Sequence, residues 1–429
     1  MKLAKVLTFL FVAFSLLLSG CVAATPEAVV DQPADPQSGM AATADNSATS
    51  APEVVTEVKI GALLPLTGGD AINGQNQKYG HEFAVEQINA AGGIKCLGGA
   101  KLTMVYGDSA GKPEAGNAET IRLIEEENVT AIMGAFHTGV TLTASETAER
   151  YGVPFIVPNS DVSARNLKYV FQTASTIQSM AEDSAEFAAQ MGGAKTAIIL
   201  TPNIAFGDWF KEDWREVLPA QGFEVVGEIS FPSGSSDFGP TILSIKQLDP
   251  DLIFTIANTS DATLMLRQMK ELNYWPKVGF ITAAGGYADP SLIQNLGADA
   301  EGIYLTNDWF PNINLPNAKE INEQFKSKYG MDMIGNINTT YAGTLVLADA
   351  LEQACSTDPE VLAQTLRSMH LTEGSWDFMY TEVQFDDQGF NKFAGNFVAQ
   401  IRDGETMTVW PAEFSVADPV WPVPSWKSR

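Results

Sequence analysis

The chain has 429 residues, with 26 Lys and Arg against 52 Asp and Glu, and a formal net charge of −26. Hydrophobic residues make up 45% and charged residues 18%, which is typical of a globular protein and not of a disordered or fibrous one. The acidic excess argues against binding to nucleic acid or to an anionic membrane surface, because both need clustered Lys and Arg. With three Cys and three His, metal clusters of these residues and a disulfide scaffold are nearly excluded.

Residues 1–20 are predicted to be an export signal. Lys2 and Lys5 precede an apolar run, 6–18, that would rise about 20 Å as a helix and is too short for a hydrocarbon core of about 30 Å. The following LSGC motif, which ends at Cys21, resembles the lipobox of bacterial lipoproteins. The resemblance implies cleavage before Cys21 and lipidation of its thiol, and the alternative is an ordinary cleavage site beside an unrelated Cys.

Residues 21–56 are predicted to be the lipidated Cys and a flexible tether. Residues 22–57 contain no Lys, Arg, Phe, Trp or Tyr, so they cannot bury enough apolar surface to offset their ordering entropy. No later apolar run approaches a transmembrane length, and we expect nothing downstream to cross the bilayer.

From residue 58 onward, short apolar runs alternate with amphipathic stretches. This alternation predicts a parallel, doubly wound α/β sheet, and the pattern restarts near residue 169 to give a second block of similar size. The predicted strands are 58–64, 102–106, 130–135, 153–157, 169–173, 196–200, 224–230, 252–257 and 278–282, with helices between them. The third block is less regular, with predicted helices at 318–329, 340–355 and 359–369 and strands at 383–385 and 397–402.

The order of these parts resembles the extracytoplasmic solute-binding proteins of ABC importers, of the branched-chain-amino-acid-binding type. The segments that carry the resemblance are Ile60-Gly61, Pro65-Leu66-Thr67-Gly68, Ala84–Gly93 running into Ile94, Asp108-Ser109, Lys112-Pro113, Gly134, Thr141–Pro154, Phe206-Gly207, Asp249-Pro250-Asp251 and Arg267-Gln268-Met269. It implies the type I periplasmic-binding fold, in which two doubly wound lobes are joined by a three-crossing hinge. Lobe one is expected to take 57–174 plus 307–380, and lobe two 175–306 plus 381–429, with a return of part of this tail to lobe one as the alternative.

The resemblance also implies a function. Such proteins bind a small solute between the lobes and deliver it to an ABC permease driven by ATPase subunits. We therefore expect a monomer, lipid-anchored on the outer side of the cell membrane, that binds a small polar solute, an amino acid or a similar compound, without a cofactor or metal. The alternatives are a lipoprotein that senses a ligand for a separate receptor, and a binder of an amide, a urea-like compound or an aromatic acid.

An enzyme is not expected. The sequence contains no G-x-S-x-G elbow, no P-loop, no G-x-G-x-x-G, no H-E-x-x-H and no paired-Cys zinc spacing.

The solute is expected beyond the carboxyl ends of the strands, where helix N-termini offer N–H groups to an anion. After the strand at 130–135, the residues His137, Thr138 and Gly139 precede a helix, and the resemblance places a hydroxyl that holds the ligand's carboxylate at Thr138. Thr138 or Thr141 could instead cap the helix.

The loop after 153–157 offers a second polar group of residues, Asn159, Ser160 and Asp161. Asp161 stands where the family has a Thr, and it could receive an ammonium or amide group or cap the turn that leads into residues 162–166.

Lobe two is expected to supply the other wall of the site. Phe206 matches an aromatic position of the family, and Asn258 and Tyr287 follow predicted strands. The acidic partner of an α-ammonium in the amino-acid binders would align near Gly285, where this sequence has none. Either Asp161 takes that role, or the ligand is not an α-amino acid.

Cys96 and Cys355 form a possible disulfide in an oxidising compartment. They lie far apart in the sequence, so only the geometry can decide.

Overall fold

A computed structural model describes residues 55–162 and 167–426. The expected signal peptide, Cys21 and the tether up to residue 54 lie outside the described residues. Among the helices that are described, none combines the length and the apolar character that a bilayer crossing needs.

The first part of the chain forms a five-stranded parallel sheet in the order β2-β1-β3-β4-β5. Its strands are β1 (Glu57–Leu64), β2 (Lys101–Asp108), β3 (Ala131–Gly134), β4 (Phe155–Val157) and β5 (Val170–Gln172). The connections are α1 (Ala71–Ala90) with the short helix η1 (Lys95–Leu97), α2 (Pro113–Glu125) and α3 (Thr138–Tyr151).

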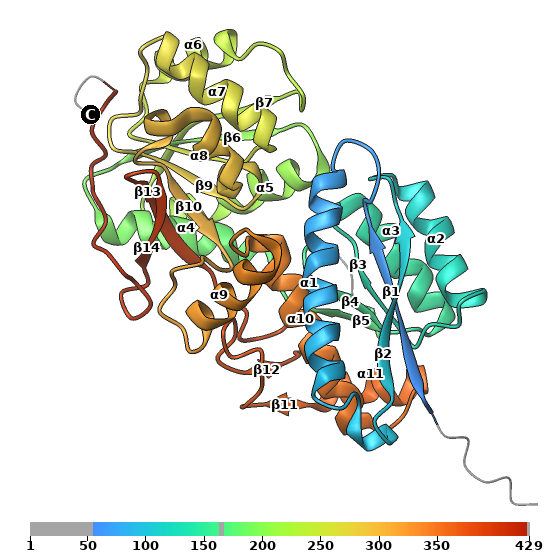
Figure 1. Cartoon of the computed structure of the whole chain (residues 1–429). Helices are drawn as coiled ribbons and strands as arrows, with labels where there is room; N and C mark the ends of the chain where they lie inside the picture. Colours follow the sequence, from blue (N-terminus) through green and yellow to red (C-terminus); the bar gives the residue numbers. More distant parts are fainter. Residues whose placement is uncertain (1–54, 163–166, 427–429) are drawn as a thin grey trace, which may run out of the picture. The chain divides into compact units, whose positions relative to one another are not determined.

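Helices cover both faces of this sheet. Successive side chains of each strand point to opposite faces, so they pack in two different hydrophobic clusters. Ile60, Met133 and Ile156 pack in one hydrophobic cluster with residues of α1 and of a later helix, α10 (Gly335–Ala354). Ile132 and Phe155, their neighbours in sequence, belong to a separate cluster with residues of α2 and α3. Figure 1 shows α1 and α10 on one side of the sheet and α2 and α3 on the other.

The second sheet has seven strands in the order β14-β13-β10-β9-β8-β6-β7. They are β6 (Thr196–Pro202), β7 (Glu224–Phe231), β8 (Leu252–Thr255), β9 (Gly279–Ala283), β10 (Tyr304–Asn307), β13 (Phe397–Arg402) and β14 (Glu405–Trp410). The strands β6 to β10 are parallel, whereas β13 and β14 come from the end of the chain and add antiparallel strands.

Helices of this second part alternate with its strands. They are α4 (Ile177–Met191), α5 (Ala205–Ala220), α6 (Gly239–Leu248), α7 (Thr259–Glu271), α8 (Pro290–Leu296) and the short helices η2 (Gly285–Ala288) and η3 (Gly297–Ala300). The remaining elements are α9 (Ala318–Tyr329), α11 (Pro359–Ser368) and a small antiparallel pair, β11 (His370–Leu371) and β12 (Val383–Gln384).

The predicted α/β class with parallel sheets is confirmed. Sequence reasoning did not find β10, β14 or α8, and it began α10 at residue 340, whereas the helix begins at Gly335. The error at α10 arises because its first turn, GNINT, is polar and resembles a loop. Asn336 in this turn donates a part-buried hydrogen bond to Asn73 of α1, 263 residues earlier in the sequence.

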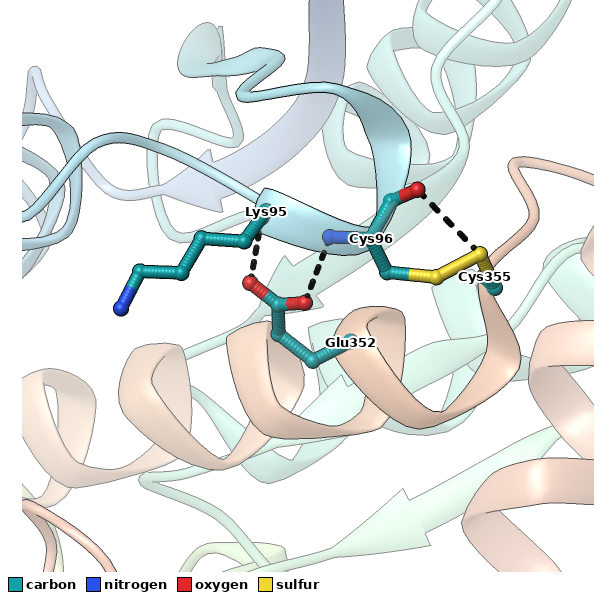
Figure 2. The surroundings of a disulfide bond; sticks show 4 residues. All are labelled: Lys95, Cys96, Glu352 and Cys355. Atoms are coloured by element: carbon teal, nitrogen blue, oxygen red, sulfur yellow. Dashed lines mark hydrogen bonds between the residues drawn. A yellow bond between two sulfur atoms is a disulfide. The ribbon is translucent and has the colours of Figure 1, made fainter.

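Cys96 and Cys355 are joined by a disulfide with a Cα–Cα distance of 5.3 Å. The carboxylate of Glu352, one turn before Cys355, accepts hydrogen bonds from the backbone N–H groups of Lys95 (2.5 Å) and Cys96 (2.9 Å) (Figure 2). The segment after α1 is therefore fixed to the C-terminal end of α10 by one covalent bond and two hydrogen bonds.

Candidate functional site

The loops that follow β1 and β2 are held together by one carboxylate. Oδ1 of Asp108 accepts hydrogen bonds from the backbone N–H groups of Leu66 (2.9 Å), Thr67 (3.2 Å) and Ala110 (2.8 Å), and Oδ2 accepts one from the Thr67 hydroxyl (2.6 Å). Burial opposes ionisation of Asp108, but these hydrogen bonds together hold its pKa below the ordinary value. Asp108 thus fixes the start of the chain segment that leads into α1.

His137 stands immediately before α3, at the carboxyl end of β3. Its Nε2 lies 2.9 Å from Oδ2 of Asp70, so Nε2–H donates to the carboxylate. This hydrogen bond is the main reason that the pKa of Asp70 lies below its ordinary value. The other ring nitrogen, Nδ1, is buried and has no hydrogen-bond partner in the protein.

The first turn of α3 has no side-chain cap from His137. Thr141, which the sequence offered as a cap, uses its hydroxyl for contacts with the backbone of Ala135 (3.3 Å) and His137 (3.1 Å). Thr138 and Gly139 begin the helix, and Thr138 is 7% exposed. An uncapped helix N-terminus beside a polar side chain favours an anionic or carbonyl oxygen.

The loop after β4 turns its polar side chains in different directions. The side-chain amide of Asn159 donates to the Thr340 hydroxyl and accepts from the Thr339 hydroxyl, both at 2.5 Å, so it fixes this loop to α10. The Ser160 hydroxyl is buried without a partner. Asp161 is 2% exposed and accepts a hydrogen bond from the backbone N–H of Ile177, the first residue of α4 (2.5 Å). This hydrogen bond links the loop after β4 to the start of α4.

The candidates on the second sheet do not share one environment. Phe206 is half-buried at the start of α5 and lies edge-on against Phe210, with ring centroids 5.2 Å apart. Asn258 is exposed and caps α7, because its side chain accepts from the backbone N–H of Asp261 (2.9 Å). Tyr287 is 1% exposed, and its hydroxyl lies 3.5 Å from the sulfur of Met265, so it is a core side chain that we leave out of the proposed site.

A polar seam between α1 and α10 was missed by sequence reasoning. The Asn336 amide donates to Oδ1 of Asn73 (3.1 Å), and two turns further along, Nδ1 of His81 lies 3.0 Å from the Thr344 hydroxyl. Burial lowers the pKa of His81 to about 3, so this histidine is neutral.

Gln77 lies between the two contacts of this seam, four residues from each of its neighbours Asn73 and His81. It is completely buried, and neither its amide oxygen nor its amide nitrogen has a partner. The sequence signal for this seam was the four-residue spacing of Asn73, Gln77 and His81 on α1. Polar residues at this spacing usually indicate a helix face exposed to solvent, so the seam was missed.

Five of the buried polar atoms without a partner belong to loops and helices at or near the carboxyl ends of the five-stranded sheet, whereas others lie in other parts of the chain. The five are Nδ1 of His137, Oγ of Ser160, both amide atoms of Gln77 and Oδ1 of Asn336. Two surface hollows of about 310 and 280 Å³ lie elsewhere, along the edge of β2 and at the start of β1. Within 55–162 and 167–426, no His, Cys, Asp and Glu side chains are grouped so as to hold a metal ion.

A family model described as Periplasmic binding protein matches residues 57–405. The chain belongs to this family. A curated relative, the Leu/Ile/Val-binding protein homolog 8 of Brucella suis biovar 1 (strain 1330), is 28% identical over 388 residues, which cover 86% of this chain and 94% of the relative.

Solved structures of similar fold include several with bound solutes. The branched-chain amino acid transporter substrate binding protein LivJ from Streptococcus pneumoniae, in complex with isoleucine, has a TM-score of 0.73 and 21% identity, and the match covers 85% of this chain and 100% of that one. A solute binding protein of an ABC transporter from Rhodopseudomonas palustris BisB5, in complex with 3,4-dihydroxybenzoic acid, has a TM-score of 0.71 and 20% identity, with 87% and 100% covered. Both share the periplasmic binding protein fold with this chain.

Proposed function

We propose that this protein is the extracytoplasmic solute-binding component of an ABC importer, which captures a small polar solute and delivers it to a permease. Membership of the periplasmic binding protein family and the Leu/Ile/Val-binding relative support the general role. The observation that carries the location of the site is the group of unpartnered polar atoms near the carboxyl ends of the five-stranded sheet. Open α/β sheets bind their ligands in this position.

The binding residues we assign are His137, Thr138 and Gly139 at the start of α3 and Ser160 after β4, with Asn159 fixing that loop to α10. Phe206 and Asn258 are assigned to the opposite wall, at the starts of α5 and α7. The solute is bound by hydrogen bonds and released unchanged, so no bond in it is broken.

The remaining parts of the proposal concern the whole chain. Cys21 carries a lipid that holds the protein on the outer side of the membrane, and residues 22–56 form the tether. The two lobes, 57–174 with 307–380 and 175–306 with 381–429, close around the solute as a monomer. The closed form then docks on the permease, and no nucleic acid takes part.

Thermal denaturation of the full-length protein tests the proposal. The panel contains leucine, isoleucine, valine, polar amino acids, short amides, urea and aromatic carboxylates. A ligand at 100 times its Kd should stabilise the protein by about 2.7 kcal/mol, which is visible as a higher Tm. If no compound of the panel raises the Tm, the proposed function is wrong.

A matched pair of variants tests the location of the site. Thr138→Val should weaken binding of the best compound by about tenfold or more, because it removes a hydroxyl at the start of α3. Thr143→Val is the control, because the Thr143 hydroxyl donates to the Gly139 carbonyl within the same helix (3.0 Å). Equal affinities of the two variants would place the site elsewhere.

A further inference from the structure

Three segments of the chain connect the two sheets. They are 173–176 between β5 and α4, the segment that begins at Asp308 after β10, and 385–396 between β12 and β13. The backbone N–H of Asn391 in the third segment donates to the carbonyl of Gln172 (2.9 Å), and the Gln172 side chain donates to the carbonyl of Ser175 in the first segment (3.0 Å). We call these segments the crossings, because a movement of one sheet relative to the other has to bend all three.

Asp308 links the second crossing to the first. It is 6% exposed, and the groups that favour its ionisation are its own backbone N–H and the backbone N–H and side chain of Ser175. The carboxyl group also acts on Tyr380, because burial and, to a lesser extent, the charge of Asp308 raise the pKa of that phenol. No basic side chain of the described residues is among the groups that act on Asp308, so burial dominates and raises its pKa to about 6.

Asp183 links the beginning of α4 to the third crossing. Its Oδ2 accepts a hydrogen bond from the side-chain amide of Asn396 (2.7 Å), which also donates to the Ser179 hydroxyl (3.2 Å). The charged neighbours of Asp183 are Glu182 and Glu186 on the same helix, and both are acidic. Burial is the largest cause that raises the pKa of Asp183 to about 6. Two carboxyl groups that resist ionisation therefore join the crossings in pairs.

Buried polar atoms without a hydrogen-bond partner are also found on the crossings and on the neighbouring Tyr380. They include the hydroxyl oxygens of Thr173 and Tyr380, Nδ2 of Asn391 and Oδ1 of Asn396. Buried polar groups are normally paired, so an arrangement that leaves several of them unpaired is disfavoured at this place. A second arrangement of the crossings, in which these groups meet one another or water, is thereby brought closer in free energy.

We propose that Asp308 and Asp183 form a proton-sensitive device in the hinge. With both carboxyl groups protonated the crossings keep the described arrangement, and ionisation favours a second arrangement in which the carboxylates reach water. The lobes therefore move more readily at neutral pH than at mildly acid pH. This inference rests on the lobe movement in the proposed function and adds a regulation of that movement by pH.

Movement of the crossings is coupled to the release of protons. Each carboxyl group has a pKa of about 6 in the described arrangement, and it returns to an ordinary pKa of about 4 once it reaches water. The second arrangement should therefore become more populated as the pH rises from about 4 to about 6, by a factor of up to about 100 for each group, and then stay constant.

Hydrogen–deuterium exchange of the full-length, solute-free protein measures this movement. The backbone N–H groups of Gln172, Thr173 and Asn391 donate to Gly389, Val157 and Gln172, and they report on the crossings. Their protection factors, corrected for the pH dependence of intrinsic exchange, should fall at least tenfold between pH 4.5 and pH 7. The N–H groups of β1 and β6 are the reference and should change less. No fall at the crossings, or an equal fall in the reference strands, would overturn the inference.

The double variant Asp308→Asn/Asp183→Asn tests the two groups directly. Its side chains keep their shape and stay neutral, so protection at the crossings should not depend on pH. Asp349→Asn is the control, because burial raises the pKa of Asp349 as well, but this residue lies on α10 and accepts from the Trp376 indole (2.9 Å). The control should keep the pH dependence of the parent. If the double variant keeps it too, or if the control loses it, the inference is wrong.

The two single variants cover the case in which the double variant does not fold. Asp308→Asn and Asp183→Asn should each show a smaller fall in protection than the parent, and an undiminished fall in both would overturn the inference.

The failures of the two proposals are distinguishable, because the exchange measurement needs no solute. Crossings that do not respond to pH overturn the inference, while a compound that raises the Tm still supports the proposed function. If no compound raises the Tm, the proposed function is wrong, and the exchange measurement still decides whether Asp308 and Asp183 control the crossings.

Discussion

Nε2 of His137 and Oδ2 of Asp70 lie 2.9 Å apart, across two loops that follow different strands of the same sheet. The contact fixes which ring nitrogen carries the proton, because only a protonated Nε2 can donate to the carboxylate. The other ring nitrogen, Nδ1, is buried and has no hydrogen-bond partner in the protein.

Asp70 is therefore expected to act as a positioning residue. In Asp70→Asn the amide keeps the shape of the side chain but can either accept from Nε2–H or donate to Nε2, so it no longer selects one tautomer of His137, and the affinity for the solute should fall roughly tenfold. Because Asp70 is 44% exposed, the Tm of the solute-free protein should stay within about 1 °C of the parent. Calorimetric titration and thermal denaturation measure the two quantities, and a loss of Tm without a loss of affinity would make the contact purely structural.

Asp108, unlike Asp70, is expected to act on stability and not on binding, because it fixes two loops through hydrogen bonds to their backbone and to Thr67. Asp108→Ala leaves the Thr67 hydroxyl and the N–H groups of Leu66 and Ala110 without their acceptor, and we expect the free energy of unfolding to fall by about 1–3 kcal/mol. The pKa of Asp108 is lowered in the folded state, so its stabilising effect is present above the ordinary pKa of Asp and is lost as the pH falls through the lowered value. Urea denaturation at pH 7 and pH 3 should show a smaller difference between parent and variant at the lower pH.

The disulfide should contribute strongly to stability, because Cys96 and Cys355 are 259 residues apart in the sequence. Closing so long a loop restricts the unfolded chain, and we expect its removal to lower the free energy of unfolding by about 2–4 kcal/mol. The measurement is urea denaturation of the parent with and without dithiothreitol. The double variant Cys96→Ser/Cys355→Ser is the control, which should match the reduced parent and not respond to the reductant. A parent that is insensitive to reduction would contradict this expectation.

The sequence predicts the strands β1, β6 and β8 because strands buried on both faces leave short, continuous apolar runs. It does not predict β10, since the residues YLTN are half polar and gain their burial from β9 and β13 on either side. Likewise the loops at His137 and Ser160 are predictable from their place after a strand. The position of Gln77 is not, because its burial depends on α10, whose Asn336 is 263 residues from its partner Asn73.

Acidification to mildly acid pH should stabilise the protein through three carboxyl groups. Burial is the largest cause that raises the pKa of Asp183, Asp213 and Asp308 to about 6. For Asp213 the neighbouring acids Asp161, Glu182, Glu212 and Glu216 add to the effect. A raised pKa in the folded state means that stability is present below the ordinary pKa of Asp and is lost as the pH rises through about 6.

Asp213→Asn isolates one of these groups. The variant should have a Tm about 1–2 °C above the parent at pH 7.5 and an equal Tm at pH 4.5, because the parent side chain is then protonated. Asp418→Asn, an exposed carboxylate near the end of the chain, should leave the Tm unchanged at both pH values. A Tm difference for Asp213→Asn that does not depend on pH would show that the carboxylate acts through packing and not through its charge.

The Gln77 side chain is expected to lower the stability of the solute-free protein and to increase its affinity for the solute. Its amide is completely buried without a hydrogen bond, which costs about 1–3 kcal/mol, so Gln77→Met should raise the free energy of unfolding of the solute-free protein by about 1 kcal/mol. The same change should weaken solute binding by about tenfold, because the methionine side chain has a similar shape but offers no donor. Gln75→Met, two residues away and half-buried, is the control and should alter neither quantity by as much. If Gln77→Met lowers the stability and leaves the affinity unchanged, the Gln77 amide serves the packing of α1 against α10, and the solute site does not extend to it.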